Sequence, residues 1–572
     1  MSNLRKAGLV VWAALFACWV QAQEQPADLV LSGGAVYTVD AARSWAEAVA
    51  IQGGRIVLVG TNRAVQPWIG PGTRVIELDG KMLLPGFQDA HVHPISGGIE
   101  LGQCNLNGLE TQAAILEKMR SYASEHLELP WLVGGGWDLP VFPHANPSKK
   151  LLDAIAPQRP VFLSAADGHS AWVNSKALQL AGITAATPDP KDGRIERDPE
   201  TGEPSGTLRE SATDLVDRLI PEPTAQERFD GLKRALELLN RHGVTAFQEA
   251  SAGRDYLETY REAQQRGELT AKVVVALYAD PDKGLDQVDR LIALRREFNS
   301  AQIRPVAVKI FEDGVIEAHT AAMLEPYLGQ AGQRGEPIWP AERLNEMVAR
   351  LAREDFNVHI HAIGDRAIRL ALDAFAAARR QESARGPRHQ IAHLEVIDPA
   401  DIARFRQLKV IANFQPLWAF ADRYITDLTW PVLGPQRSRS IYPIASVARA
   451  GGAVAFGSDW SVSSLNPLEG IQVAVTRQSP AGRAGEPMLP EQALDLPAAL
   501  AAYTIGSAYA LGLERETGSI EVGKSADLIV LSANLFTLPP REIDQTKVLL
   551  TLLDGKPVYR DPGFALGAQS GS

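Results

Sequence analysis

The feature that most constrains the fold is an alternation of short apolar runs with amphipathic segments through the middle of the chain. Eight near-continuous apolar runs end near 91–93, 244–250, 273–279, 306–311, 358–361, 390–394, 410–415 and 454–459. Between them lie segments with a 3.6-residue period, such as 225–241, 341–353 and 366–379. Buried strands that alternate with helices in this way predict an α/β fold, a closed parallel (β/α)8 barrel of the TIM type.

Both ends of the chain have a different pattern, of short strands separated by glycine and asparagine turns. Residues 28–39 are predicted to form two paired strands joined by a turn at Gly33 and Gly34. Further short strands are expected at 48–51, 55–59, 74–77, 526–531, 548–553 and 557–559. Two β-rich ends around an α/β middle predict one composite β-sandwich built from both termini.

The predicted domains follow from these patterns. Residues 23–80 and 516–563 form the two parts of the sandwich, and 81–515 form the barrel. The stretch from about 100 to 235 is rich in Gly, Pro and Asp and departs from the alternation, so it is predicted to be an insertion after the first barrel strand. The Gly-, Ser- and Gln-rich tail at 564–572 is expected to be disordered.

Residues 1–22 have the pattern of a signal peptide. Arg5 and Lys6 precede an apolar run that is too short to span a bilayer and that ends in a small-residue Val-Gln-Ala cleavage pattern. We expect cleavage after Ala22 and a periplasmic or secreted protein. The alternative is a lipoprotein with a lipid anchor at Cys18, in an imperfect Leu-Phe-Ala-Cys box. No later segment is apolar for long enough to cross a membrane.

Composition excludes several classes of protein. The formal net charge is −11, aromatic residues make up 7%, and no basic blocks occur, so we expect no nucleic-acid partner. Two cysteines exclude a disulfide framework and are too few for a thiolate zinc site.

The histidines carry the strongest chemical signal. His91 and His93 are two residues apart at the end of the first predicted strand, so they project to the same side and can share a metal ion. Other polar residues end the fourth, fifth, sixth and eighth runs. Because the C-terminal strand ends of such a barrel surround one pocket, we expect all of them to meet there. The set is His91, His93, Lys309, His361, His393 and Asp459, a metal site with nitrogen and oxygen donors.

In combination, several segments resemble the amidohydrolase superfamily, in the branch called amidohydrolase family 3, which includes N-substituted formamide deformylases. The segments are PGFQDAHVHP (85–94), GWD (136–138), DGHSAWVNSKAL (167–178), VKIFEDG (308–314), HAIGD (361–365), HLE (393–395) and GSDW (457–460). The resemblance spans essentially the whole chain after the signal peptide. It implies a barrel with a composite sandwich, and a hydrolase that uses one or two divalent metal ions. Zinc is the first expectation, because neutral imidazoles and carboxylates suit it.

The resemblance also implies roles for the ligands. His91, His93 and Asp459 would hold one ion, His361 and His393 a second, and Lys309 would bridge them as a carbamate. A lysine between strand walls loses solvation, so its free amine can trap carbon dioxide. The alternative for Lys309 is an ion pair with Glu312 or Asp313. Asp459 would move a proton from the attacking water to the leaving nitrogen, and its alternative is a helix N-cap after the eighth strand.

Further residues are expected around the substrate. By resemblance, His169 faces the substrate carbonyl as an electrophile or positioning donor, whereas the alternative is a solvated loop histidine. His359, two residues before His361, also faces inward and competes for the ligand role. Pocket-lining residues are predicted to be Trp137, Asp138, Gln415, Trp418 and Trp460, with packing in the core as the alternative. The tryptophans favour an aromatic or long apolar substituent.

We therefore predict an exported metal-dependent amidohydrolase that cleaves a non-peptide C–N bond, of amide or formamide type, in a small molecule. Metal binding makes hydroxide available at neutral pH for this reaction. One alternative is the same metal site acting on an ester or lactone, deaminating a ring, or isomerising its substrate. Another is a non-catalytic exported binding protein. The resemblance further implies a homodimer.

Overall fold

The centre of the fold is a closed sheet of parallel strands. The computed structural model describes residues 26–379, 386–480 and 485–566, and within them eight strands follow one another around this sheet in chain order. They are β8 (Phe87–Val92), β15 (Val244–Ala252), β16 (Lys272–Tyr278), β17 (Ile303–Phe311), β18 (Asn357–Ala362), β19 (Gln390–His393), β20 (Ile411–Phe414) and β21 (Ala453–Phe456). Each pairs in parallel with the next. The predicted β/α barrel is confirmed.

Hydrogen bonds between the end of β8 and the segment that follows β21 close the barrel. The backbone N–H of Asp459 donates to the carbonyl oxygen of His91 at 2.7 Å, and that of His93 donates to the carbonyl oxygen of Trp460 at 2.9 Å. Closure therefore places Asp459 beside two histidines that come far earlier in the chain.

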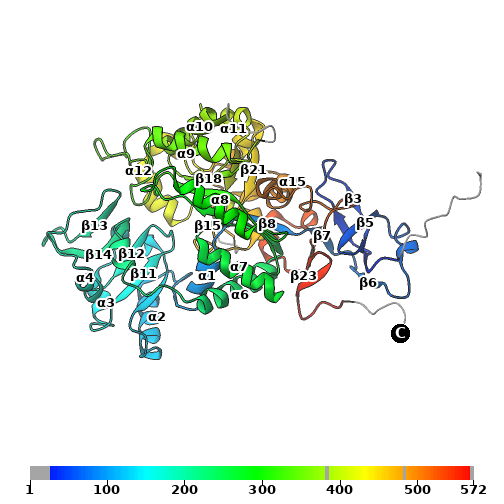
Figure 1. The fold of residues 1–572 in the computed structure, drawn as a ribbon, viewed down its shortest axis with the longest axis horizontal. Helices are drawn as coiled ribbons and strands as arrows, with labels where there is room; N and C mark the ends of the chain where they lie inside the picture. Colours follow the sequence, from blue (N-terminus) through cyan, green and yellow to red (C-terminus); the bar gives the residue numbers. More distant parts are fainter. Residues whose placement is uncertain (1–25, 380–385, 481–484, 567–572) are drawn as a thin grey trace, which may run out of the picture.

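Helices cover the outside of the barrel (Figure 1). Three of them, α6 (Ala225–Arg241), α9 (Ala341–Arg353) and α10 (Asp365–Ala378), agree within one residue with the segments predicted from their period. The further helices of this part are α1 (Pro94–Glu100), α7 (Arg254–Arg266), α8 (Gln287–Phe298), α11 (Ile402–Leu408), α12 (Trp430–Arg437), α13 (Ile444–Arg449), α14 (Pro467–Thr476), α15 (Leu496–Ala501) and α16 (Ser507–Leu511).

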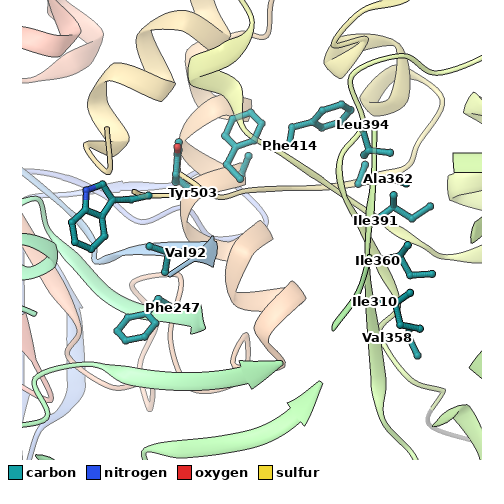
Figure 2. Packing of buried hydrophobic residues seen from close by; sticks show 14 of the residues in the cluster. Val92, Phe247, Ile310, Val358, Ile360, Ala362, Ile391, Leu394, Phe414 and Tyr503 are labelled. Carbon is teal, nitrogen blue, oxygen red and sulfur yellow. The ribbon is translucent and has the colours of Figure 1, made fainter. Parts of the chain in front are cut away.

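Side chains of the barrel strands alternate between two environments, as strand geometry requires. On β18, Val358 and Ile360 belong to the main hydrophobic core, together with Ile391 of the neighbouring strand (Figure 2). His359 and His361 lie between and beyond them in sequence, and therefore project to the opposite side, into the barrel. The apolar face packs against helices, which leaves the inner face available for chemistry.

Strands from both ends of the chain form the predicted composite sandwich. One sheet has the order β5–β4–β1–β6, and the other, β24–β23–β22–β7–β2–β3, joins N-terminal to C-terminal strands. Their bounds are β1 (Leu29–Ser32), β2 (Ala35–Tyr37), β3 (Trp45–Ala46), β4 (Ala48–Gln52), β5 (Arg55–Gly60), β6 (Arg74–Glu77), β7 (Met82–Pro85), β22 (Leu528–Leu531), β23 (Val548–Leu553) and β24 (Lys556–Arg560). Phe564, placed by the sequence in the tail, is buried in this sandwich core, and residues 567–572 lie outside the described part.

The hairpin predicted over 28–39 is wrong, because β1 and β2 belong to different sheets. β1 pairs with β4 and β6, whereas β2 pairs with β3 and β7. The glycines between them lead the chain from one sheet to the other through a tight space: a Cβ on Gly34 would lie 2.4 Å from the side chain of Leu78. The Gly-Gly pair thus serves close packing rather than a two-strand turn.

The predicted insertion forms a sheet of its own beside the barrel, at the opposite end from the sandwich (Figure 1). Its strand order is β13 (Gly193–Arg197), β14 (Pro204–Glu210), β12 (Ser170–Val173), β11 (Val161–Ala165), β10 (Leu132–Trp137) and β9 (Cys104–Asn105). Helices α2 (Gln112–Glu125), α3 (Lys149–Asp153), α4 (Ser175–Ala181) and α5 (Asp214–Asp217) accompany it. No helix among the described residues is long and apolar enough to span a bilayer. The signal-peptide residues and Cys18 lie outside those residues.

Candidate metal centre

The ends of β8 and β21 bring two histidines and one aspartate together. His91 lies on β8, His93 directly precedes α1, and Asp459 follows β21 in the left-handed region, with φ of 54°. Asp459 Oδ1 is 3.4 Å from His91 Nε2 and 3.3 Å from His93 Nε2. One ligand atom of each residue lies within 4.8 Å of the others. These three residues are called the metal cluster below, and the described chain brings no other such group this close.

Neighbouring side chains hold the rings of both histidines. His359 Nε2 lies 2.8 Å from His91 Nδ1, and the Gln248 amide nitrogen lies 2.7 Å from His359 Nδ1. On the other side, Glu249 Oε1 is 3.6 Å from His93 Nδ1. Each ring therefore turns its Nε2 toward Asp459, as metal-binding histidines do when a second protein group orients them. Both ring nitrogens of His359 are engaged by protein groups, so it supports a ligand position and does not occupy one.

The electrostatics of the cluster favour a positive charge. Burial, and then the charge of Lys309, lower the pKa of His91 well below its usual range, so its ring is neutral. Burial acts in the same direction on His93, but the carboxylates of Asp459 and Glu249 raise its pKa to about 9. Two carboxylates thus stabilise a cation at this point of the barrel mouth.

The residues present fit a divalent metal ion. Imidazole nitrogen and carboxylate oxygen are the donors that zinc and related ions take. In addition, the buried Nδ1 of His393 has no hydrogen-bond partner and lies 3.7 Å from Asp459 Oδ2. Buried polar atoms without a partner are rare in folded proteins. An ion held beside Asp459 would account for this one.

His361 lies in the same cavity but outside the metal cluster. Its Nε2 is 3.3 Å from the carbonyl oxygen of Gly314, and its ring centroid is 4.4 Å from that of His393. Both rings have pKa values well below the usual range, chiefly because they are buried, so both are neutral and able to bind a metal.

Lys309 extends from β17 into the same group of side chains. Its Nζ is 3.4 Å from His91 Nε2, and the residue is 1% exposed. Burial lowers its pKa to about 7, against the opposing charge of Asp459. In the described part of the chain it forms no ion pair with Glu312 or Asp313, so that alternative is wrong.

The alternative for Asp459 is also not realised. The first helix after β21 is α14, which begins at Pro467 and is capped by the side chain of Asn466. Asp459 is thus free of a capping role and contributes its carboxylate to the cluster.

His169 reaches the cavity from the insertion. Its Nδ1 is 2.8 Å from Glu210 Oε2, and its ring centroid is 5.3 Å from that of His361. Burial disfavours charge on this ring, but Glu210 raises its pKa to about 9. His169 is therefore a largely enclosed cation beside the metal cluster, not a solvated loop residue.

These groups line a single cavity of about 820 Å³. Of the predicted pocket residues, Asp138 and Trp418 line it, and the Trp418 ring stacks on His393 with centroids 5.6 Å apart. The other three predicted pocket residues are buried and do not line the cavity: Trp137, Gln415 and Trp460. Trp137 packs in the insertion, where its indole N–H donates to the Leu163 carbonyl oxygen at 2.9 Å.

Comparison with known proteins identifies the family. The model of the amidohydrolase family matches residues 74–559. The chain belongs to the amidohydrolase family. This amidohydrolase is 32% identical over 547 residues to the protein LONG AFTER FAR-RED 3 of Arabidopsis thaliana, covering 93% of this chain and 92% of that protein. It is 31% identical over 555 residues to an N-substituted formamide deformylase of Arthrobacter pascens, covering 94% of this chain and 99% of that protein.

The fold of the amidohydrolase has a solved counterpart. An uncharacterized metal-dependent hydrolase from Pyrococcus horikoshii OT3 superposes with a TM-score of 0.71 at 25% identity, covering 90% of this chain and 99% of that one. The resemblance to amidohydrolase family 3 is thereby confirmed. The amidohydrolase is a metal-dependent hydrolase that acts on carbon–nitrogen bonds, with His91, His93 and Asp459 as its candidate metal site. The alternative of a non-catalytic binding protein is set aside.

Sequence reasoning missed several residues that support the site. Glu249 gave a signal, because it is a carboxylate within the apolar run of the second barrel strand, and it is completely buried. Glu210 gave none, because nothing in its surroundings in the chain indicates that it pairs with His169. Glu317 and Asp422 likewise lie in loops and are recognised only by their place in the cavity.

Proposed function

We propose that this protein is exported and hydrolyses the amide bond of a small N-acyl amine, with N-substituted formamides as the first class to test. The observation that carries the proposal is the His91–His93–Asp459 cluster in the wall of a cavity of about 820 Å³. Sites of this size accommodate a small molecule with its reactive bond held at a few polar groups. The similarity to an N-substituted formamide deformylase over 94% of the chain supports the choice of substrate.

His91, His93 and Asp459 would hold one divalent ion, with zinc the first expectation from the donor set. When bound, such an ion supplies Lewis acidity, which polarises a substrate carbonyl and makes water more acidic. We propose that His361 and His393 hold a second ion, with Lys309 shared between the two as a carbamate. The support is that Lys309 is buried, has a pKa lowered by burial to about 7, and lies beside His91.

The chain's own residues then move protons and position the substrate. Asp459 Oδ1 lies near the rings of His91 and His93, and its Oδ2 lies near His393, so the carboxylate is placed to accept a proton from water and return it to the leaving nitrogen. His169, charged through its pair with Glu210, is placed to donate a hydrogen bond to the carbonyl oxygen. Trp418 offers an aromatic wall to the substituent.

The direct test combines metal analysis with hydrolysis of N-substituted formamides, N-acyl amines and matched esters. Asp459→Asn should keep the fold and lower kcat by roughly a thousandfold or more, since it loses the proton acceptor. Asp282→Asn, in an exposed loop outside the cavity, is the matched control and should behave as the wild type. Full activity of a chelated, metal-free preparation would refute the metal mechanism, and turnover of esters alone would refute the amide assignment.

A further inference from the structure

Besides Asp459, several carboxylates line the cavity, and five of them lie in loops that follow strands of the insertion or of the barrel and are considered together. They are Asp138, Asp167, Glu317, Glu395 and Asp422, called the acidic wall below. Asp138 follows β10, Asp167 follows β11, and the other three follow β17, β19 and β20. Strands of the insertion and of the barrel thus converge on one strongly acidic region.

The members of the acidic wall are close enough to repel one another. Burial, and then the charges of Asp167 and Asp422, raise the pKa of Glu317 to about 7. Burial likewise raises the pKa of Asp422 to about 6, and the charge of Asp138 adds to the effect. Such repulsion destabilises the empty site, because like charges at short range oppose ionisation.

Within the described residues, only neutral groups donate to this wall. The hydroxyl of Thr429 donates to Glu317 at 2.7 Å, and the hydroxyl of Tyr424 donates to Asp138 at 3.4 Å. Backbone N–H groups donate to Asp167 and Asp422, at 3.0 and 2.9 Å. No lysine or arginine of the described chain forms an ion pair with any of the five.

Glu395 shows most clearly that a partner is missing. It lines the cavity and is only 5% exposed; the Tyr442 hydroxyl donates to its carboxylate, but Oε2 has no hydrogen-bond partner. Arg423, a basic residue in the same lining, is 61% exposed and pairs with Asp427. A buried carboxylate without a cation or a full set of donors is costly unless a ligand supplies them.

The spacing of the acidic wall selects an organic cation over a metal ion. Among the described residues, the metal cluster is the only group of three or more ligand residues whose atoms lie within 4.8 Å of one another. No three of the wall carboxylates therefore lie close enough together to coordinate one ion as the metal cluster would. An ammonium or guanidinium group carries three to five N–H donors and can reach several separated acceptors.

We propose that the substrate carries a positively charged group, an ammonium or a guanidinium, that binds at the acidic wall while its amide lies at the metal cluster. This inference rests on the proposed function, which identifies the amide as the bond that is cleaved. It adds that the substituent on that amide is positively charged. Trp418 and the apolar side chains of Leu417 and Ile425 line the same cavity, so an alkyl or aryl spacer can join the two ends.

The first test measures binding and does not depend on turnover. In titration calorimetry of the metal-containing protein, n-hexylamine should bind at least about tenfold more tightly than n-hexanol, since hydrogen bonds between charged groups exceed those between neutral ones. Glu317→Gln and Asp422→Asn should each remove most of that preference. Glu237→Gln, on the exposed face of α6, is the control and should retain it.

The second test measures hydrolysis and separates the two proposals. The monoformamide of hexamethylenediamine should have a kcat/KM at least about tenfold above that of N-hexylformamide, and the two wall variants should reduce this ratio. Equal binding of amine and alcohol, or a preference that survives both variants, would overturn the cation site even if N-hexylformamide is hydrolysed. If neither formamide is hydrolysed but the amine preference and its loss in the variants hold, the cation site stands and the proposed function fails.

The wall variants should also fold. Removing one charge from a group of mutually repelling carboxylates relieves repulsion, so the thermal unfolding midpoint of Glu317→Gln should equal or exceed that of the wild type. This measurement distinguishes a lost binding site from a lost fold.

Discussion

The Nε2 atom of His359 lies 2.8 Å from Nδ1 of His91, deep in the barrel beneath the metal cluster. His359 is in turn held by Gln248, whose amide oxygen accepts a hydrogen bond from Gln390 at 3.0 Å. A buried polar chain thus fixes the ring of a metal-binding histidine from behind. Mutation of a group that orients a metal ligand in this way typically lowers metal affinity about 10- to 100-fold.

We expect His359→Gln to lower zinc affinity about 10- to 100-fold, because the His91 ring loses its orienting partner. Competition with a chromophoric chelator measures the affinity. His389→Gln is the control, since His389 is also buried but stacks on Phe375 of α10, outside the barrel. Unchanged zinc affinity in His359→Gln would show that the contact has no role in metal binding.

The proposed carbamate on Lys309 predicts a change in metal stoichiometry. Lys309→Met should reduce the bound metal from two ions per chain to one or fewer, because the shared ligand is lost. Elemental analysis of the purified protein measures this, and a short-chain carboxylic acid added to Lys309→Ala should restore part of the second ion. Two tightly bound ions in Lys309→Met would contradict the bridging role.

Gly457, which follows β21, packs closely against the backbone of His91 on β8. A Cβ at this position would lie 2.6 Å from the backbone nitrogen of His91 and 2.7 Å from its Cβ. We expect Gly457→Ala to cost about 1–3 kcal/mol of stability, as overpacking does, and to weaken zinc binding by displacing His91. Thermal unfolding and chelator competition measure the two effects. Gly72→Ala, where an added Cβ meets nothing within 4 Å, should change neither.

The insertion contains a charge pair that makes stability depend on pH. Arg209 is 2% exposed and its Nε donates to Glu196 at 3.2 Å. Burial alone would raise the pKa of Glu196, but Arg194 and Arg209 lower it below the usual value of 4.5. A carboxylate with a lower pKa in the folded state stabilises the protein above its unfolded pKa, and this stabilisation disappears as the pH falls through the folded pKa.

Glu196→Gln should therefore reduce the free energy of unfolding by about 2 kcal/mol at neutral pH, with the difference from the wild type shrinking below pH 4.5. Urea unfolding at a series of pH values measures it. Glu200→Gln, in the exposed turn between β13 and β14, is the comparison variant. A difference that stays constant down to acidic pH would mean that the carboxylate charge is not involved.

If the protein is exported, the N-terminus of its mature form can be predicted. Protein recovered from a bacterial periplasm should begin at residue 23, because the signal peptide is expected to end at Ala22. Intact-mass spectrometry reads this directly. An acylated N-terminal Cys18 would support the lipoprotein alternative, and an uncleaved chain in the cytoplasm would refute export.

Much of the fold could be predicted because each signal is local. The apolar runs predicted the barrel strands, and the 3.6-residue period predicted α6 and α9. Both patterns depend only on residues near one another in the chain. The gathering of His91, His93 and Asp459 was also predictable, since strand ends of a closed barrel share one rim. Here the motifs and the geometry point to the same residues.

Trp137 shows where such reasoning fails. It is the last residue of a glycine-rich strand, and the pairing of β10 with β11 shifts register between Gly135 and Trp137, with φ of 89° at Gly136. A one-residue shift turns a side chain to the other face of a sheet. The indole therefore packs into the insertion core, while Asp138, the next residue, lines the cavity.

The amino-acid order alone determined the alternation of strands and helices, the two β-rich ends, and which residue types stand at the strand ends. Only the tertiary structure decided that Glu317, Glu395 and Asp422 share one wall, and that His359 supports His91 without joining the cluster. The physical reason is that periodicity reports on neighbours in the chain, whereas contacts between loops depend on how the barrel closes and how the insertion packs beside it.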